Sequence, residues 1–154
     1  MKTKRLVPVL LGLLVMVGGL AARAQTPVAS ASTPAQAAKT HHVVFAVTSG
    51  DEADWGLTLG NIRNLLKGLA PDAVEVEVVA FGPGLGMVKK GSSVDADIQA
   101  LESKRVRFVA CENSMRMQHV TVADLLVGVG TVPSGIVEVV TKQEQGWSYV
   151  KGGR

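Results

Sequence analysis

The chain of 154 residues has a single cysteine, Cys111. One thiol cannot form a disulfide within the chain, and it cannot supply the paired cysteines of a zinc site. The three histidines, His41, His42 and His119, show no i, i+4 pair and no zinc-ligand spacing. We therefore expect neither a disulfide framework nor a metal centre.

Two common functional motifs are also missing. The segment Gly82-Pro83-Gly84-Leu85-Gly86 follows an apolar run, but Met87 occupies the third glycine position of G-x-G-x-x-G, so the dinucleotide-binding fingerprint is incomplete. The glycine turn that remains either exposes backbone amides to a small anion or serves turn geometry alone. The sequence has no Gly-x-Ser-x-Gly elbow, and nothing in it supports hydrolase chemistry.

The N-terminus has the three parts of a secretory signal peptide. Lys2, Lys4 and Arg5 form a basic start, residues 6–20 are apolar, and residues 22–24 supply a small-x-small cleavage site. The apolar stretch has fifteen residues and contains Pro8, so it is shorter than the ~18 residues of a membrane-spanning helix. We expect cleavage near Ala24, export to the periplasm or the medium, and no membrane attachment afterwards.

Cleavage of residues 1–24 changes the charge of the chain. The full sequence has 16 Lys and Arg against 13 Asp and Glu, and four of the basic residues lie in the signal. The mature chain then has a net charge of about minus one, so it offers no excess positive charge to nucleic acid or to an anionic membrane. We expect neither as a partner. A lipid anchor would need a cysteine at the cleavage site, and Cys111 is far from it.

The rest of the chain divides into a linker and one domain. Residues 25–40 are mostly Ala, Ser, Thr, Pro and Gln, a composition that predicts a flexible linker. Residues 41–151 have the size of a single domain with one core. Residues 152–154 are left as a short tail.

Predicted strands and helices alternate along this domain. Apolar runs predict strands over residues 43–48, 74–81, 106–110, 129–132 and 147–150. Apolar residues at helical spacing predict helical segments over residues 55–69, 85–90, 94–101, 115–116 and 122–126, and from residue 135 onward. In the second strand, Glu75 and Glu77 are expected to point outward.

Several details of the helices can also be predicted. The expected N-caps are Asp54, Ser93, either Asn113 or Ser114, and Ser134. The helix that begins at residue 135 is expected to bury Ile136, Val139 and Val140. Gly56 and Gly60 leave a flat strip on the first helix, which is either an oligomer contact or ordinary packing of the helix on the sheet.

The alternation predicts an α/β fold of three layers, with a mostly parallel sheet of about five strands and helices on both faces. Ligands bind such sheets beyond the carboxyl ends of the strands. Four segments are expected to meet at that edge: residues 49–51, 82–84, 111–114 and 133–135.

Cys111 lies at this edge, where an apolar strand gives way to a polar turn. The position favours a functional thiol, although a cysteine that ends such a strand is equally explained as a small core residue. A helix start alone contributes roughly 0.3–1 kcal/mol, which is less than one pKa unit. Arg116 would add positive charge near the sulfur, and Glu112 would oppose it if its carboxylate points that way.

Several segments together resemble the DsrE/DsrF-like family. They are residues 43–47, 55–66, 78–84, 109–115, 132–135 and 146–147. The resemblance implies a YchN-like α/β subunit, usually assembled as a trimer or hexamer, with relatives that relay sulfur as a cysteine persulfide. Cys111 matches their sulfur-accepting cysteine. The other matched segments would form the wall of its pocket, for which the candidate residues are Ser49, Gly50, Gly82, Gly84, Asn113, Ser114, Arg116 and Ser134.

Three functions follow from these observations. The first is a sulfur carrier or sulfurtransferase that accepts sulfur on Cys111, exchanges it with donor and acceptor proteins, and needs no cofactor. The second is a non-catalytic oligomeric module that binds a small ligand, with Cys111 in the pocket lining. The third is a thiol redox sensor that pairs Cys111 between subunits.

Overall fold

The computed structural model describes residues 39–154. The predicted signal peptide and almost all of the predicted linker lie outside the described residues. Among residues 39–154, no helix has the length and apolar character that crossing a membrane requires.

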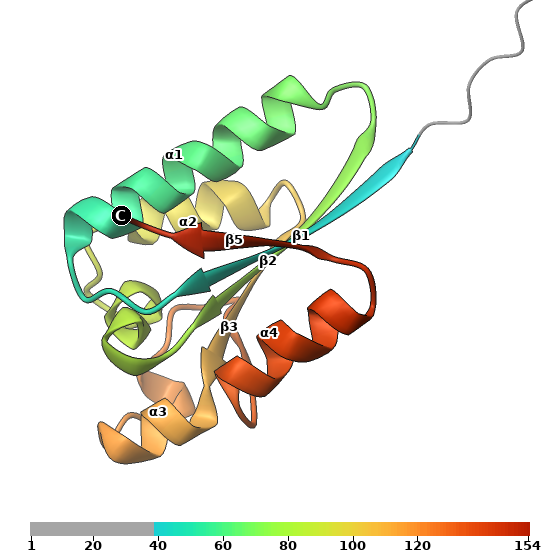
Figure 1. Cartoon of the computed structure of the whole chain (residues 1–154). Helices are drawn as coiled ribbons and strands as arrows, with labels where there is room; N and C mark the ends of the chain where they lie inside the picture. Colours follow the sequence, from blue (N-terminus) through green and yellow to red (C-terminus); the bar gives the residue numbers. More distant parts are fainter. Residues whose placement is uncertain (1–38) are drawn as a thin grey trace, which may run out of the picture. The chain divides into compact units, whose positions relative to one another are not determined.

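Five parallel strands form one sheet in the order β4-β3-β2-β1-β5 (Figure 1). Their bounds are β1 Thr40–Val47, β2 Ala73–Ala80, β3 Val106–Cys111, β4 Gly130–Val132 and β5 Ser148–Gly152. The helices are α1 Glu52–Gly68, α2 Asp95–Glu102, α3 Glu112–Met117 and α4 Gly135–Glu144, with short 3-10 helices η1 Gly82–Val88 and η2 Val122–Asp124. The predicted α/β fold with a five-stranded parallel sheet is confirmed.

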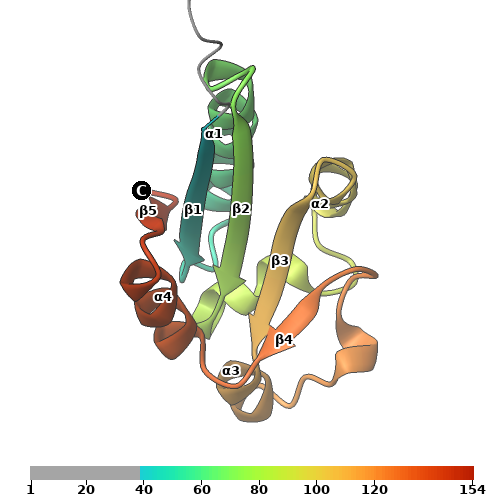
Figure 2. The same ribbon diagram turned by 90° about the vertical axis from the view of Figure 1, so that its right-hand side faces the viewer.

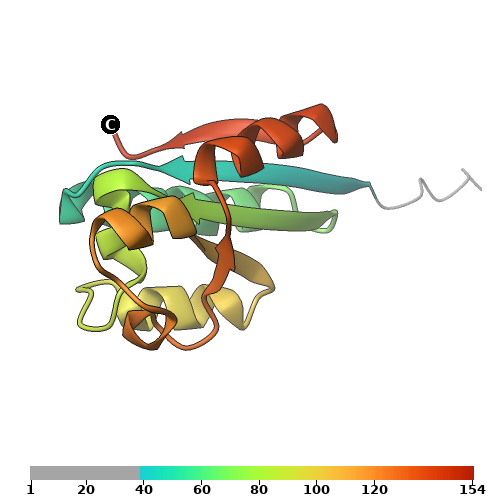
Figure 3. The same cartoon turned by 90° about the horizontal axis from the view of Figure 1, so that it is seen from below.

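Helices cover both faces of the sheet, because alternate residues of the apolar strands face opposite sides. In β1, Val43, Phe45 and Val47 pack in the larger core with α1, α2 and η1, whereas Val44 and Ala46 pack in a smaller core beneath α4. The smaller core has six buried residues, because α4 lies over β1, β2 and β5 and leaves β3 and β4 less covered (Figures 2 and 3).

The chain beyond residue 151 is more than a tail. Strand β5 continues through Gly152. The backbone N–H and the Nε of Arg154 both donate to Oδ1 of Asp54, at 3.1 and 2.9 Å. The last residue therefore ties β5 to the start of α1.

Three of the predicted helix caps are wrong. Helix α1 begins three residues earlier than expected: Asp51 is its N-cap and accepts from the Ala53 N–H at 2.9 Å, which leaves Asp54 free to bind Arg154. Helix α2 follows Val94, so Ser93 is not its cap. Helix α3 begins directly after Cys111, which places Asn113 and Ser114 inside the helix.

Helix α4 starts where it was predicted but turns a different face to the sheet. Ser134 occupies the N-cap position, although its hydroxyl makes no capping hydrogen bond. Val139 is buried as expected, but Ile136 is 57% exposed and Val140 47% exposed, so the prediction for these two is wrong. The inward stripe instead runs through Gly135, Val139 and Lys142, because Lys142 reaches a buried carboxylate on β2.

The glycine strip on α1 does not pack against the sheet. A Cβ added at Gly56 or Gly60 would meet no atom within 4 Å, and both residues are half-buried. Ordinary packing on the sheet therefore does not explain these two glycines.

Candidate functional site

Cys111 is the last residue of β3 and the N-cap of α3, at the carboxyl edge of the sheet. The residue is 4% exposed and pairs in register with Val132 of the neighbouring strand β4. Three segments of the predicted edge meet around it: the turn after β2, the start of α3 and the start of α4. The fold thus brings together residues that are far apart in the sequence.

Two helix N-termini converge on the sulfur. The backbone N–H groups of Asn113 and Ser114, in the first turn of α3, lower the pKa of the Cys111 thiol. The N–H of Gly135, the first residue of α4, lowers the same pKa. The first N–H groups of a helix have no partner inside the helix, so they are available to an external acceptor. At Cys111 that acceptor is the sulfur.

Ser114 adds a fourth donor to this site. Its hydroxyl also lowers the pKa of Cys111, and its Oγ accepts from the Gly82 N–H at 2.8 Å. One turn further along α3, Nε2 of Gln118 donates to the Gly82 carbonyl at 2.7 Å. We call this arrangement of Ser114 and Gln118 around Gly82 the Gly82 clasp. The clasp joins α3 to η1, which lie side by side at this edge (Figure 3).

These hydrogen bonds change the acidity of the thiol. Burial raises the pKa of Cys111, because it penalises the anion. The Ser114 hydroxyl and the N–H groups of Gly135, Ser114 and Asn113 lower it by more, since they stabilise the thiolate. The pKa of Cys111 therefore lies below that of an ordinary cysteine, which increases the thiolate fraction at neutral pH.

The two charged neighbours of the thiol are bound elsewhere. Oε1 of Glu112 accepts from the Thr131 hydroxyl at 2.9 Å, so this carboxylate is held by β4. The guanidinium of Arg116 donates to the side-chain oxygen of Asn113 on the exposed side of α3. The site is consequently built from neutral hydrogen-bond donors, with no direct ion pair to the sulfur among the contacts of residues 39–154.

A cavity of about 460 Å³ lies beside the clasp, within the usual range for small-molecule sites. It is lined by Gly82, Pro83, Ser114, Met117 and Gln118. Ser114 thus lines the cavity and also lowers the pKa of Cys111. Two of the candidate wall residues, Gly82 and Ser114, line this cavity.

The remaining candidate wall residues have other surroundings. The Ser49 hydroxyl accepts from the Asp51 N–H at 3.1 Å, and a Cβ on Gly50 would lie 3.3 Å from Pro83. Gly84 packs so tightly on β1 that a Cβ there would lie 2.2 Å from the Val47 carbonyl oxygen. Gly50 and Gly84 pack the turn after β2 against the end of β1, whereas the Ser49 hydroxyl binds within the loop that follows β1. Ser134 adjoins the site through its neighbour Gly135.

Two residues of the site were missed at the sequence level. Gly135 was expected at this edge within the segment 133–135, but its amide was assigned no role, and Gln118 was not expected at the site. Gln118 follows Ser114 by four residues, the spacing that places two side chains on one helix face, and this was the available signal. No local pattern predicts that the Gly135 amide approaches β3.

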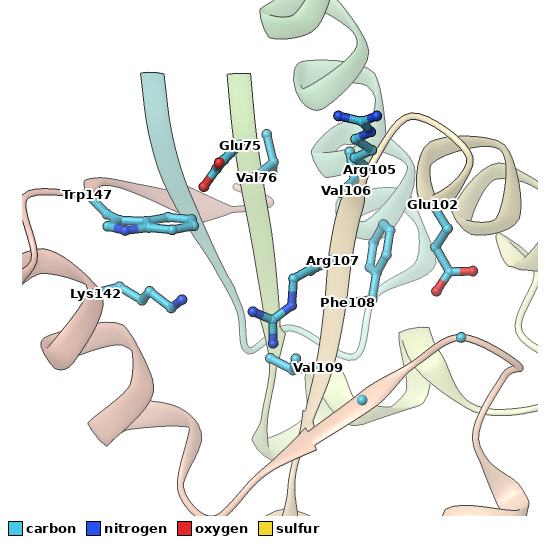
Figure 4. Close-up of a pocket in the computed structure, with 12 residues that line it drawn as sticks. Glu75, Val76, Glu102, Arg105, Val106, Arg107, Phe108, Val109, Lys142 and Trp147 are labelled. Atoms are coloured by element: carbon cyan, nitrogen blue, oxygen red, sulfur yellow. The ribbon is translucent and has the colours of Figure 1, made fainter. Parts of the chain in front are cut away.

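A larger cavity of about 770 Å³ lies on the α4 side of β2 and β3, reaching around the outer edge of β3 (Figure 4). Its polar lining includes Glu75, Arg107 and Lys142, with the Trp147 ring 4.3 Å from Nζ of Lys142. Here the prediction that Glu77 points outward is wrong. Glu77 is 0% exposed, because the face that it shares with Glu75 is covered at this point by α4.

Glu77 is a buried carboxylate between two cations. Its Oε2 lies 3.2 Å from Nη1 of Arg107 and 3.3 Å from Nζ of Lys142, but neither of its oxygens receives a well-oriented hydrogen bond. Burial raises the pKa of Glu77, and the nearby Glu138 carboxyl raises it further, against the lowering effect of Lys142 and Arg107. In residues 39–154, no group of three or more His, Cys, Asp or Glu could hold a metal ion.

Comparison with known proteins gives one family and several similar structures, among them the two that follow. The model of the DsrE/DsrF-like family matches residues 41–151. The structure of MTH1491, a protein of unknown function from Methanobacterium thermoautotrophicum, is similar with 36% sequence identity and a TM-score of 0.69 over 72% of this chain and 98% of that one. The YchN protein from E. coli has a similar fold, with 12% identity and a TM-score of 0.57 over the same shares of the two chains. No curated protein matches the chain.

Proposed function

The chain belongs to the DsrE/DsrF-like family, and from this premise we propose that it is a sulfur carrier or sulfurtransferase that holds sulfur as a persulfide on Cys111. The observation that carries the proposal is the environment of the thiol. Four hydrogen-bond donors, which are three N–H groups at two helix starts and one hydroxyl, lower the pKa of the thiol. A cavity of about 460 Å³ lies beside them. A core cysteine with a packing role alone would need none of these donors.

The proposed chemistry consists of two balanced sulfur transfers. The Cys111 thiolate attacks the outer sulfur of a donor persulfide, R–S–SH. A bond forms from Sγ to that sulfur, the donor S–S bond breaks, and its electron pair leaves with the donor as R–S⁻. Attack of an acceptor thiolate on the outer sulfur of Cys111–S–SH then forms the acceptor persulfide and restores the Cys111 thiolate. No net oxidation or reduction occurs and no cofactor is required.

The same donors would assist both transfers. In the first transfer they increase the fraction of thiolate, which is the nucleophile. In the second, Sγ of Cys111 is the leaving group, and a thiol with a lower pKa leaves faster. The N–H groups of Asn113, Ser114 and Gly135 are fixed by two helices, so they need little rearrangement as charge returns to the sulfur.

The predicted export would determine in which compartment the chain meets its sulfur donor and acceptor. If residues 1–24 direct it to the periplasm or the medium, the sulfur donor and acceptor are proteins or small thiols of an oxidising compartment. Burial of Cys111 would then protect a single thiol from random disulfide formation. We propose that the mature chain acts as a trimer or hexamer, with no nucleic acid or membrane partner.

One observation favours a non-catalytic module instead. Cys111 is 4% exposed and does not line the cavity beside the Gly82 clasp, as expected if the cavity holds a small ligand and the cysteine is only packed nearby. The two functions differ in the reactivity of the thiol.

Alkylation of the native mature chain with iodoacetamide separates these functions. A sulfur carrier reacts in the native state, faster than an ordinary thiol at pH 7, and Cys111→Ala does not react at all. A thiol that reacts only after denaturation supports the binding module and contradicts the carrier. A disulfide between subunits on a non-reducing gel, formed under mild oxidants and absent from Cys111→Ala, supports the redox sensor.

A further inference from the structure

We propose that Ser114 is a positioning residue for the Cys111 sulfur. The Gly82 N–H donates to the hydroxyl oxygen of Ser114, so that the hydroxyl proton is directed to the sulfur. This inference rests on the proposed function, because it assigns the residue that prepares the thiol for sulfur transfer. Its consequence is that the turn after β2 controls the reactivity of a cysteine on β3.

The donor and acceptor count of the hydroxyl supports this direction. A serine hydroxyl has one proton to donate and lone pairs that accept. At Ser114 the Gly82 N–H, at 2.8 Å, fixes the hydroxyl as an acceptor on the β2 side. The residue is 9% exposed, and buried hydroxyls are almost always hydrogen-bonded. We assign the proton to the sulfur of Cys111, three residues earlier on the same turn, because the Ser114 hydroxyl lowers the pKa of that thiol.

The turn itself is held in place by the second arm of the clasp. Gly82 has φ +55, a left-handed conformation in which glycine carries no steric penalty. Its N–H binds Ser114 and its carbonyl binds Gln118, so both backbone groups of one residue are held by side chains one helical turn apart. An amide that donates to Oγ also polarises the O–H bond and makes it a stronger donor to the sulfur.

A different role for the clasp is a latch that merely covers the thiol. In that case removal of Ser114 would expose Cys111 and speed its reactions without changing its acidity. The two roles therefore predict opposite effects on the reaction rate at neutral pH, and they can be separated by a pH profile.

The experiment is the rate of iodoacetamide alkylation of Cys111 from pH 5 to pH 10, which gives an apparent pKa and a limiting rate constant for the thiolate. Ser114→Ala is expected to raise the pKa by about one unit, because a hydrogen bond to an ionised group contributes on the order of 1.4 kcal/mol or more. Alkylation at pH 6 then slows about tenfold. Gln118→Ala keeps the hydroxyl and is expected to move the pKa by less than about 0.3 units.

Ser114→Thr and Ser114→Val provide a matched pair, because their side chains have nearly the same shape and differ in the hydroxyl. The threonine variant is expected to keep the wild-type pKa and the valine variant to raise it like alanine. This comparison remains informative if Ser114→Ala fails to fold. An unchanged pKa in both Ser114→Ala and Ser114→Val overturns the inference, and a faster limiting rate with the same pKa assigns the clasp as a latch.

The pKa measurement is independent of sulfur transfer. If Cys111 never accepts sulfur but Ser114→Ala raises its pKa, the proposed function fails and the role of Ser114 stands. If sulfur is accepted equally well by Ser114→Ala with an unchanged pKa, the function stands and this inference fails.

Discussion

At the scale of single residues, Glu77 is unusual because its carboxylate is fully buried on the sheet. A carboxylate without a well-oriented hydrogen bond is costly in a protein interior, even between Arg107 and Lys142. Its pKa is raised, chiefly by burial, so the folded chain binds the Glu77 proton more tightly than the unfolded chain does. The resulting stabilisation is complete below the unfolded pKa of about 4.3 and is lost as the pH rises through the raised pKa.

Glu77→Gln removes this titration. We expect wild-type stability to fall relative to that of Glu77→Gln as the pH rises from 4 to 8, measured as urea midpoints of the mature chain. Glu75→Gln removes an exposed carboxylate two residues earlier on the same strand and is the control. A constant difference in midpoint between wild type and Glu77→Gln over this range would show that Glu77 keeps its unfolded pKa.

Residue spacing predicted which residues of β2 share a face, but it did not predict which of them are buried. The period of two correctly places Glu75 and Glu77 on one face of β2, because successive side chains alternate. Which part of that face meets solvent depends on the position of α4, whose contact with β2 joins residues more than fifty positions apart. The same limit applies to Ser114, which was expected as a cap or a wall residue. Its partner Gly82 is 32 residues away.

At the scale of elements, the placement of α4 decides whether its first amide reaches Cys111. The helix starts against β2: a Cβ added to Gly135 would lie 2.9 Å from Cβ of Phe81. Real Cβ atoms do not approach so closely, so any larger residue at position 135 moves the helix or the ring.

Gly135→Ala is therefore expected to destabilise the domain by about 1–3 kcal/mol, the usual cost of overpacking, and to raise the pKa of Cys111 by moving a donor away from the sulfur. Gly60→Ala, on α1, meets no atom within 4 Å and is the control. It should stabilise the domain by about 0.5–1 kcal/mol through helix propensity. Urea unfolding measures both effects, and equal stabilisation by the two variants would refute the close packing of α4.

The start of α1 depends on Arg154 in a similar way. The side-chain hydrogen bond from Arg154 is the largest effect on Asp54, whose pKa is lowered to about 2. A lowered pKa contributes stability that is present above the unfolded pKa of about 3.9 and is lost as the pH falls toward 2.

Arg154→Ala should consequently lower the urea midpoint at pH 6, and the difference from wild type should shrink between pH 4 and pH 2. Lys104→Ala removes an exposed cation from the turn before β3 and is the control. A difference that persists unchanged at pH 2 would mean that Arg154 stabilises the chain by packing and not by its ion pair with Asp54.

At the scale of the whole molecule, α4 presents an apolar surface to solvent. Ile136, Val137 and Val140 are all exposed on this helix, and Tyr149 is exposed on the adjacent β5. Exposed apolar residues that gather in one place mark contact surfaces more often than scattered ones do. This surface supports the proposal that the mature chain assembles as a trimer or hexamer.

Val137→Glu is expected to reduce the assembly to smaller species, measured as molar mass by light scattering after gel filtration. Leu57→Glu places the same charge on α1, beside Gly56 and Gly60, and is the matched control. If Leu57→Glu dissociates the assembly and Val137→Glu does not, the glycine strip on α1 is the contact surface. A monomeric wild type contradicts the proposed assembly altogether.

The overall fold was predictable because strong local signals agree with it. Valine-rich runs at residues 43–47 and 76–80 predicted buried parallel strands, and glycine or serine after each run marked the ligand-binding edge. The site was predictable as a place, with Cys111 at that edge. Its donors were not, because Gly135 and Cys111 meet through the register of β3 and β4, which the sequence pattern does not specify.

The central claim is that Cys111 accepts sulfur, and the mass of the intact mature chain tests it most directly. The chain is incubated with a small-molecule persulfide, separated from it, and measured beside Cys111→Ala. The account predicts that wild type gains one sulfur atom, loses it on treatment with a reducing thiol, and that Cys111→Ala gains none. No gain in wild type, or an equal gain in Cys111→Ala, would contradict it.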